Sequence, residues 1–114
     1  MADNKIYINF DEGLKRMMNN ASFYAKMLVK FKNNNTMKDV EEALAGGDME
    51  KAQTACHTLK GTAGNLSLTE LHLQSLELET QIKSNSVNPG QLSVLKSTFT
   101  ETLAEIEKVI TKYA

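Results

Sequence analysis

The segment from residue 55 to residue 66 decides how this chain folds. It reads Ala55-Cys56-His57-Thr58-Leu59-Lys60-Gly61-Thr62-Ala63-Gly64-Asn65-Leu66. Apolar residues recur before and through it at alternating steps of three and four, the spacing of a continuous apolar stripe on one side of a helix. The stripe consists of Met49, Ala52, Cys56, Leu59, Ala63 and Leu66. A helix capped by Asp48 and packed against a core by this stripe is therefore predicted.

A second face of the same helix carries His57, Lys60, Gly61 and Gly64. An imidazole, an ammonium group and two residues without side chains therefore share one outward strip. Each interior glycine costs a helix about 1 kcal/mol relative to alanine, and a helix that only packs against a core has no need of such a strip. Residues that break a local rule without a structural gain point to function. The strip is therefore the first candidate for a functional site.

The rest of the chain also reads as helix. Four longer amphipathic segments, joined by short links, are typical of an antiparallel four-helix bundle. They start near Asn20, Asp48, Ser67 and Asn88. Two shorter helices are predicted in the N-terminal half, one that begins after Asn9 and one from Thr36 to Ala45. We expect an all-α fold in which the two short helices cover one end of the bundle.

Several single residues receive a structural interpretation. Cys56 lies about 100° from His57 around the helix, which disfavours a thiol–imidazole pair and favours a core residue. His72 is expected on the surface because no helper residue lies at helical spacing from it. Leu73 and Leu76 lie off the apolar stripe of their helix, so they either complete a broad core face or contact a partner. The residues expected to face inward from the first helix are Phe10, Leu14, Met17 and Met18.

Length and composition limit the kind of protein. The 114 residues fit a single domain from residue 1 to residue 114, with residues 1–8 as an N-terminal arm. A net charge of −1 gives no electrostatic footprint for nucleic acid. No run of about 18 apolar residues is present, and the N-terminus has no apolar signal-peptide core. We expect a cytoplasmic monomer that binds neither nucleic acid nor membrane.

The motif His57-Thr58-Leu59-Lys60-Gly61-Thr62-Ala63, followed by Asn65-Leu66, closely resembles the signature of histidine-containing phosphotransfer (Hpt) domains. Further segments look like the same family: Phe10–Leu14, the segment through Phe31, Ala43–Asp48 and Leu78-Glu79. The resemblance covers roughly residues 8 to 110. One departure is Ser67, where the family usually has glycine. Ser67 and Glu70 match the Ser-x-x-Glu capping box of a helix N-terminus, so the turn is expected to be kept.

The resemblance implies roles for the residues of the strip. In Hpt domains a histidine carries a phosphoryl group between the aspartates of two receiver domains, which makes His57 the expected phosphoryl acceptor. A histidine with an ordinary pKa of about 6.5 is mostly neutral at pH 7 and offers a lone pair for attack on phosphorus. Lys60 is expected to stabilise the phosphoryl oxygens. The two glycines are expected to leave room for the receiver, and the polar side chains of Thr62 and Asn65 are expected to add contacts. The expected binding residues are Gly61, Gly64, Thr62 and Asn65.

The chain lacks the sequence motifs of a nucleotide-dependent enzyme. It has neither a glycine-rich phosphate loop nor a pair of metal-binding acids, and the face around His57 offers too few ligands for a metal. We therefore expect a phosphoryl carrier without an ATP site, a cofactor or a metal of its own. The resemblance implies that its partners are receiver domains of a hybrid sensor kinase and of a downstream regulator, which supply the acidic pocket and Mg²⁺.

Two alternatives remain open from the sequence. The first keeps the chemistry: the chain is the phosphotransfer domain of a chemotaxis-type histidine kinase and is phosphorylated by an ATP-binding domain. The second is a non-catalytic helical adaptor, in which the face around His57 only docks a partner. Incubation with a phosphorylated receiver separates these possibilities.

Overall fold

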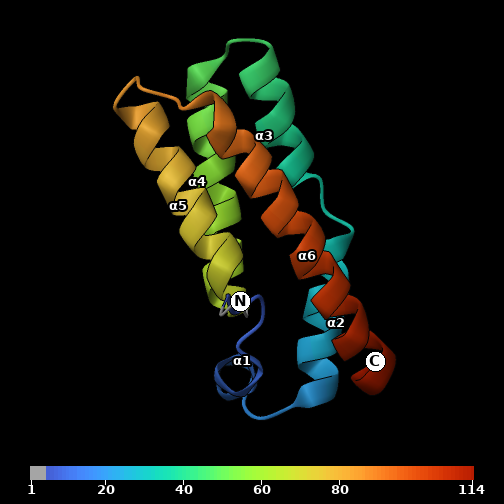
Figure 1. Cartoon of the computed structure of the whole chain (residues 1–114). Coiled ribbons are helices and arrows are strands. Elements are labelled where there is room, and N and C mark those ends of the chain that lie inside the picture. The colour runs from blue at the N-terminus through green and yellow to red at the C-terminus, as the bar shows by residue number, and fades with distance from the viewer. Residues whose placement is uncertain (1–4) are drawn as a thin grey trace.

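The computed structural model describes residues 5–114 and contains six helices joined by short links (Figure 1). The helices are α1 Phe10–Arg16, α2 Ala21–Lys32, α3 Thr36–Ala45, α4 Met49–Asn65, α5 Thr69–Lys83 and α6 Pro89–Tyr113. Within residues 5–114 there is no strand, and no helix is long and apolar enough to cross a lipid bilayer. The predicted all-α class with a helical bundle is confirmed.

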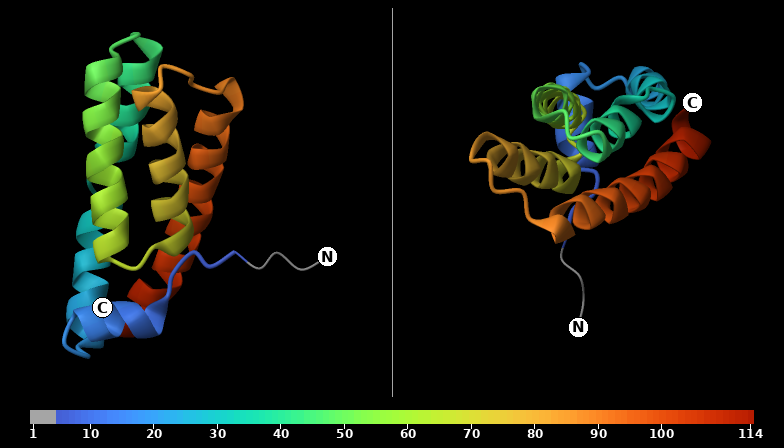
Figure 2. Two further views of the ribbon diagram at one scale, coloured as in Figure 1. Left: turned by 90° about the vertical axis from the view of Figure 1, so that its left-hand side faces the viewer. Right: turned by 90° about the horizontal axis from the view of Figure 1, so that it is seen from above.

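The helices form four columns that run up and down in alternation, and α1 lies across one end (Figures 1 and 2). α4, α5 and α6 are one column each. α2 and α3 follow each other in the same direction as the fourth column, with α3 against α4 and α2 against α6. The prediction that both short helices cover one end is therefore right for α1 and wrong for α3. With 12 residues, α2 is too short to cover the 25 residues of α6, and α3 extends its column.

Polar side chains begin the helices at the predicted places. Asn9, Asn20 and Asp48 accept hydrogen bonds from main-chain N–H groups three residues further on, at 3.2, 2.9 and 3.1 Å. These bonds satisfy donors that a helix leaves unpaired in its first turn. Asn88 caps α6, and Pro89 takes its first helical position, where no N–H is needed.

The core lies between the columns and is mostly aliphatic. Its fully buried members include Tyr24, Leu28, Val40, Ala52, Cys56, Leu59, Leu71, Leu78, Leu95 and Ile106. Cys56 is a core residue, as predicted. Burial, together with the charge of Glu79, raises the pKa of its thiol to about 12. A thiol with so high a pKa stays protonated and unreactive near neutral pH.

The turn between α4 and α5 differs from the predicted capping box. Ser67 has a left-handed backbone conformation with a φ of 57°, which glycine adopts more easily than any residue with a Cβ atom. The hydroxyl of Ser67 donates to Glu12 Oε1 at 2.7 Å, and the main-chain N–H of Glu70 donates to Ile6 O at 2.9 Å. The predicted capping box is therefore wrong. A tertiary hydrogen bond to α1, rather than a local cap, accompanies the serine at this position.

Four residues of the N-terminal region are partly buried and pack against the core: Ile8, Phe10, Leu14 and Met17. Met18 is 90% exposed because the chain turns through left-handed conformations at residues 18 and 19 after α1 ends, so its predicted inward orientation is wrong. Residues 1–4 of the predicted arm lie outside the described residues. The single domain over residues 1–114 stays a prediction.

Gly13 of α1 permits a close contact with the side chain of Tyr24. A Cβ atom at residue 13 would lie 2.3 Å from both Cζ and the hydroxyl oxygen of Tyr24. Tyr24 is fully buried and its hydroxyl donates to Leu66 O, so the ring cannot move aside without losing that bond. We expect Gly13→Ala to lower the free energy of unfolding by about 1–3 kcal/mol, the usual cost of overpacking, in urea titrations.

Gly61→Ala is the matched control for this prediction. It makes the same change inside a helix, but nothing lies within 4 Å of the new Cβ atom. Its free energy of unfolding should rise by up to about 1 kcal/mol, because alanine favours the helix. Wild-type stability in Gly13→Ala would show that Tyr24 has room to move.

Candidate functional site

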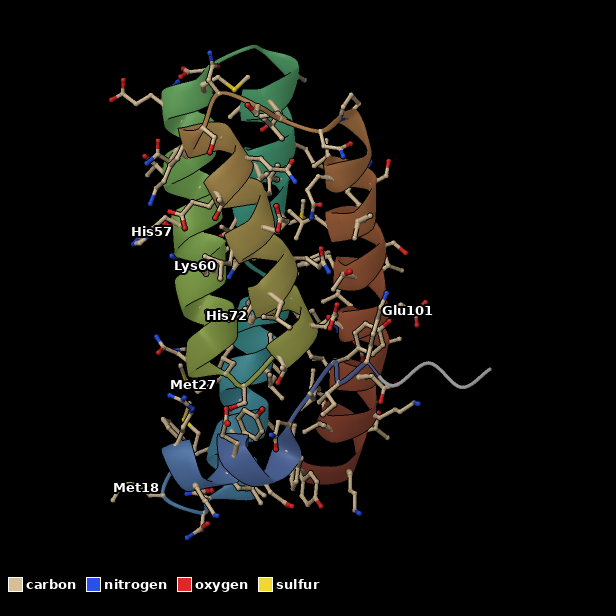
Figure 3. The ribbon with its side chains drawn as sticks, turned by 60° about the vertical axis from the view of Figure 1, so that its left-hand side comes forward. Met18, Met27, His57, Lys60, His72 and Glu101 are labelled. Carbon is tan, nitrogen blue, oxygen red and sulfur yellow. The ribbon has the colours of Figure 1, made fainter. Side chains whose placement is uncertain are left out.

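His57 projects from the outer face of α4, and its side chain is 68% exposed (Figure 3). Cys56 and Leu59, which belong to the apolar stripe, are fully buried. The helix continues without a break past Gly61 to Asn65. Of the strip predicted from the sequence, His57 and Gly61 are exposed, whereas Lys60 and Gly64 are partly covered.

A buried carboxylate from the neighbouring helix holds the imidazole in place. Glu79 of α5 is 2% exposed, and its Oε2 lies 2.9 Å from His57 Nδ1. An ionised carboxylate can only accept hydrogen bonds, so Nδ1 carries a proton and donates it to this bond. In a neutral imidazole, a proton on Nδ1 leaves the lone pair on Nε2. Nε2 is thus the nitrogen available to an incoming group.

Two lysines also approach Glu79. Lys60 Nζ donates to Oε1 at 2.7 Å, and Lys83 Nζ lies 3.7 Å from Oε2. Burial acts to raise the pKa of the Glu79 carboxyl. The hydrogen bonds from Lys60 and His57 and the charges of the two lysines outweigh burial, so the pKa lies below its ordinary value of 4.5. Glu79 is therefore ionised at neutral pH although it is buried.

The side chain of Lys60 points toward α5. It is only 20% exposed, and its ammonium group is engaged by Glu79. Its direct contact with a phosphoryl group stays a prediction. The contact present here is with the carboxylate that holds His57, so Lys60 belongs to the support of the imidazole.

The two glycines of the strip have different surroundings. A Cβ atom on Gly61 would meet nothing within 4 Å, whereas one on Gly64 would lie 3.1 Å from Nδ1 of His72. His72 is half-buried, and its Nδ1 lies 3.0 Å from the carbonyl oxygen of Lys60, to which it donates. The interpretation of His72 as a surface residue without a partner is therefore wrong. Gly61 leaves open space beside His57, and Gly64 makes room for a histidine that joins α5 to α4.

Thr62 and Asn65 lie five and eight residues beyond His57 on α4. Together they line a groove with Arg16, Met27 and Lys30, where α4 meets α1 and α2. Met27 is labelled at this end of the face in Figure 3. The structure does not bring either residue into the cluster around Glu79, and their part in binding stays a prediction.

Leu73 and Leu76 of α5 are 49% and 41% exposed. They do not complete the core, which leaves the second of the two interpretations, contact with a partner, as a prediction. Leu76 lies one turn before Glu79 on the helix that forms one side of the site.

The role of Glu79 was missed by reasoning from the sequence. The available signal is its place directly after the buried Leu78, at the edge of the apolar stripe of α5. A carboxylate at such a position needs a partner, because an unpaired buried charge is costly. Which partner it finds depends on how α5 packs against α4.

The lowered pKa of Glu79 makes stability depend on pH. In the unfolded chain this carboxyl takes up a proton near its ordinary pKa of 4.5, whereas the folded protein keeps it charged to lower pH. Between the two pKa values the unfolded state binds more protons, so the free energy of unfolding falls as the pH is lowered. This stabilisation is fully present above the unfolded pKa and is lost as the pH falls through the folded pKa.

We therefore expect Glu79→Gln to flatten the decline in the free energy of unfolding as the pH falls below the ordinary pKa of 4.5, measured by urea titration at each pH. Glu101→Gln is the control. Glu101 lies exposed on α6 (Figure 3), and its side chain has no hydrogen bond or ion pair within residues 5–114, so its variant should keep the wild-type decline. Equal declines in wild type and Glu79→Gln would contradict the lowered pKa.

Comparisons with known proteins add one finding. A model of the Hpt domain family matches residues 31–110 of the chain, a stretch that includes both His57 and Glu79. Comparisons with curated proteins and with solved structures found no match. Among residues 5–114, no three His, Cys, Asp or Glu side chains are grouped so that they could hold a metal ion.

Proposed function

Because the chain belongs to the Hpt domain family, we propose that His57 accepts a phosphoryl group from the phosphoaspartate of one receiver domain and passes it to the aspartate of another. Hpt domains serve histidine phosphotransfer in two-component signalling. The observation that carries the proposal is the exposed ring of His57, held through Nδ1 by the buried Glu79. This arrangement leaves Nε2 as the nucleophile.

In the proposed reaction, the lone pair of His57 Nε2 attacks the phosphorus atom of the phosphoaspartate. An N–P bond forms while the P–O bond to the aspartyl oxygen breaks, and the aspartate leaves as a carboxylate with the electron pair of that bond. The proton on Nδ1 stays in place, so positive charge develops on the ring next to Glu79, which stabilises it. Transfer to the second receiver reverses these changes.

The neighbouring residues support the same reaction. Gly61 leaves space where a receiver must bring its aspartate close to the imidazole. Lys60 offsets the charge of Glu79 and so helps to keep a buried, ionised carboxylate bonded to His57 Nδ1. The acidic pocket and Mg²⁺ would be supplied by the receiver, so the chain acts as a phosphoryl carrier. The partners proposed are receiver domains of a hybrid sensor kinase and of a downstream regulator, met by a monomer in the cytoplasm.

The test is to incubate the protein with a receiver domain that carries a radiolabelled phosphoryl group on its aspartate. We expect label on His57 that is lost in acid and kept in alkali, as an N–P bond requires. Label that comes from an ATP-binding kinase domain and from no receiver would favour the chemotaxis-type alternative. Absence of label from either donor would leave the non-catalytic adaptor.

A further inference from the structure

The two lysines that share Glu79 are held in different ways. Lys60 Nζ makes a 2.7 Å hydrogen bond to Oε1, and its side chain is mostly buried. Lys83 Nζ lies 3.7 Å from Oε2, which is too far for a hydrogen bond, and its side chain is 55% exposed. The lysine end of this ion pair is solvated although Glu79 is buried, and no hydrogen bond holds it in place. Lys83 can therefore leave Glu79 more easily than Lys60 can.

Lys83 is also on the side of Glu79 that faces the imidazole. The oxygen that lies 3.7 Å from its ammonium group is Oε2, which is the atom that accepts the hydrogen bond from His57 Nδ1. Lys60 contacts the other oxygen of the carboxylate. A lysine ammonium sits on a flexible four-carbon stem, so Lys83 Nζ can swing from Oε2 toward a group bound to Nε2.

The charge balance around Glu79 changes when His57 gains a phosphoryl group. One lysine is enough to neutralise the carboxylate, so the second leaves a surplus positive charge next to the imidazole. A phosphoryl group on Nε2 brings negative charge to the same place. Opposite charges within about 4–6 Å favour the charged forms of both groups, which makes the surplus cation complementary to the phosphoryl group.

We propose that Lys83 is the residue that contacts the phosphoryl oxygens on His57, while Lys60 stays on Glu79 and keeps that carboxylate in place. The proposal rests on the proposed function, since it needs a phosphoryl group on His57. It assigns to Lys83 the contact that the sequence motif suggests for Lys60. If Lys60 moved to the phosphoryl group, the buried carboxylate of Glu79 would lose its shortest hydrogen bond. That change costs more free energy than the movement of Lys83.

A purely structural role for Lys83 must be separated from this one. Lys83 is the last residue of α5, and a cation there interacts favourably with the helix dipole. Loss of that interaction would lower the stability of α5 but would leave the ionisation of a phosphoryl group on His57 unchanged. The deciding measurement is therefore made on the phosphohistidine itself.

The experiment uses the whole chain, phosphorylated with phosphoramidate, and follows the second ionisation of the phosphoryl group on His57 by phosphorus NMR. A cation in contact favours the doubly charged form and lowers the pKa of the phosphoryl group. We expect Lys83→Gln to raise this pKa by about 0.3–0.7. Lys83→Arg should restore the wild-type value, and the difference between wild type and Lys83→Gln should shrink at high salt.

Lys96→Gln is the matched control. Lys96 Nζ lies 3.7 Å from Glu41 Oε2 and its side chain is 53% exposed, which matches Lys83 in distance and exposure, although Glu41 is 38% exposed and the pair joins α6 to α3. The Lys96→Gln variant should leave the pKa of the phosphoryl group on His57 unchanged. Two results would overturn the role of Lys83 alone, provided that His57 is labelled. One is an equal pKa of the phosphoryl group in wild type and in Lys83→Gln. The other is a larger shift of that pKa in Lys60→Gln than in Lys83→Gln. A wild-type protein that takes no label on His57 from phosphoramidate or from a phosphorylated receiver would overturn the proposed function and this inference together.

Discussion

His57→Gln is expected to accept no detectable phosphoryl group from a phosphorylated receiver, yet to unfold at nearly the wild-type urea concentration. Acceptance is lost because the amide nitrogen of glutamine has no lone pair available for attack on phosphorus. The free energy of unfolding should change by less than about 0.5 kcal/mol, because the side chain is mostly exposed and the new amide can still donate to Glu79. Retained radiolabel measures acceptance, and urea titration measures stability.

His72→Gln is the control for this prediction. His72 is the other histidine of the chain, and it joins α5 to the main chain of α4. Its replacement should cost some stability and leave the label on His57. Label on His57→Gln at the wild-type level would show that the acceptor lies elsewhere.

Gly61→Gln is expected to lose most of its phosphoryl transfer from a receiver while its melting temperature stays equal to or above that of wild type. The space around Gly61 is open, so a glutamine meets no neighbour there, and glutamine is a better helix former than glycine. The new side chain would stand one turn from His57, where the receiver has to bring its phosphoaspartate within bonding distance of Nε2. The initial rate of transfer and a thermal melt followed by circular dichroism measure the two effects.

A small phosphodonor separates access from chemistry in the Gly61→Gln protein. Phosphoramidate needs far less space than a receiver domain, so its labelling of His57 should fall much less than transfer from the receiver. Gly64→Gln offers a contrast, because its Cβ atom would meet His72 and the variant should lose stability. A destabilised Gly61→Gln would mean that residue 61 is needed for packing, and the docking explanation would have to be given up.

The features that could be predicted from the sequence depend on residues close together along the chain. The apolar period of α4 placed His57 outside the core, because a period of three and four defines the faces of one helix. Asn20 and Asp48 marked helix starts, because a capping side chain reaches only the first turn. Both patterns act over one or two turns and can be read without knowledge of the packing.

The missed features depend on contacts between helices. His57 and Glu79 are 22 residues apart, and the carbonyl of Lys60 and the ring of His72 are 12 residues apart. No spacing rule within one helix relates such residues. The packing of α5 on α4 creates these contacts, and it gave Lys60 a partner that the motif alone does not show. The hydroxyl of Ser67 likewise finds its partner in Glu12, which is 55 residues away.

The hydrogen bonds that join residues 6–24 to the α4–α5 turn make these two regions one cooperative unit. Ile6 and Asn9 bond to it through the main chain, and Glu12 and Tyr24 through their side chains. A local opening of the turn must break these bonds and detach α1, so the turn opens only at the free-energy cost of the larger unit. The end of α4 that follows His57 is thereby kept from fraying. The backbone beside His57, where a receiver would dock, is therefore kept rigid by residues 6–24 near the N-terminus.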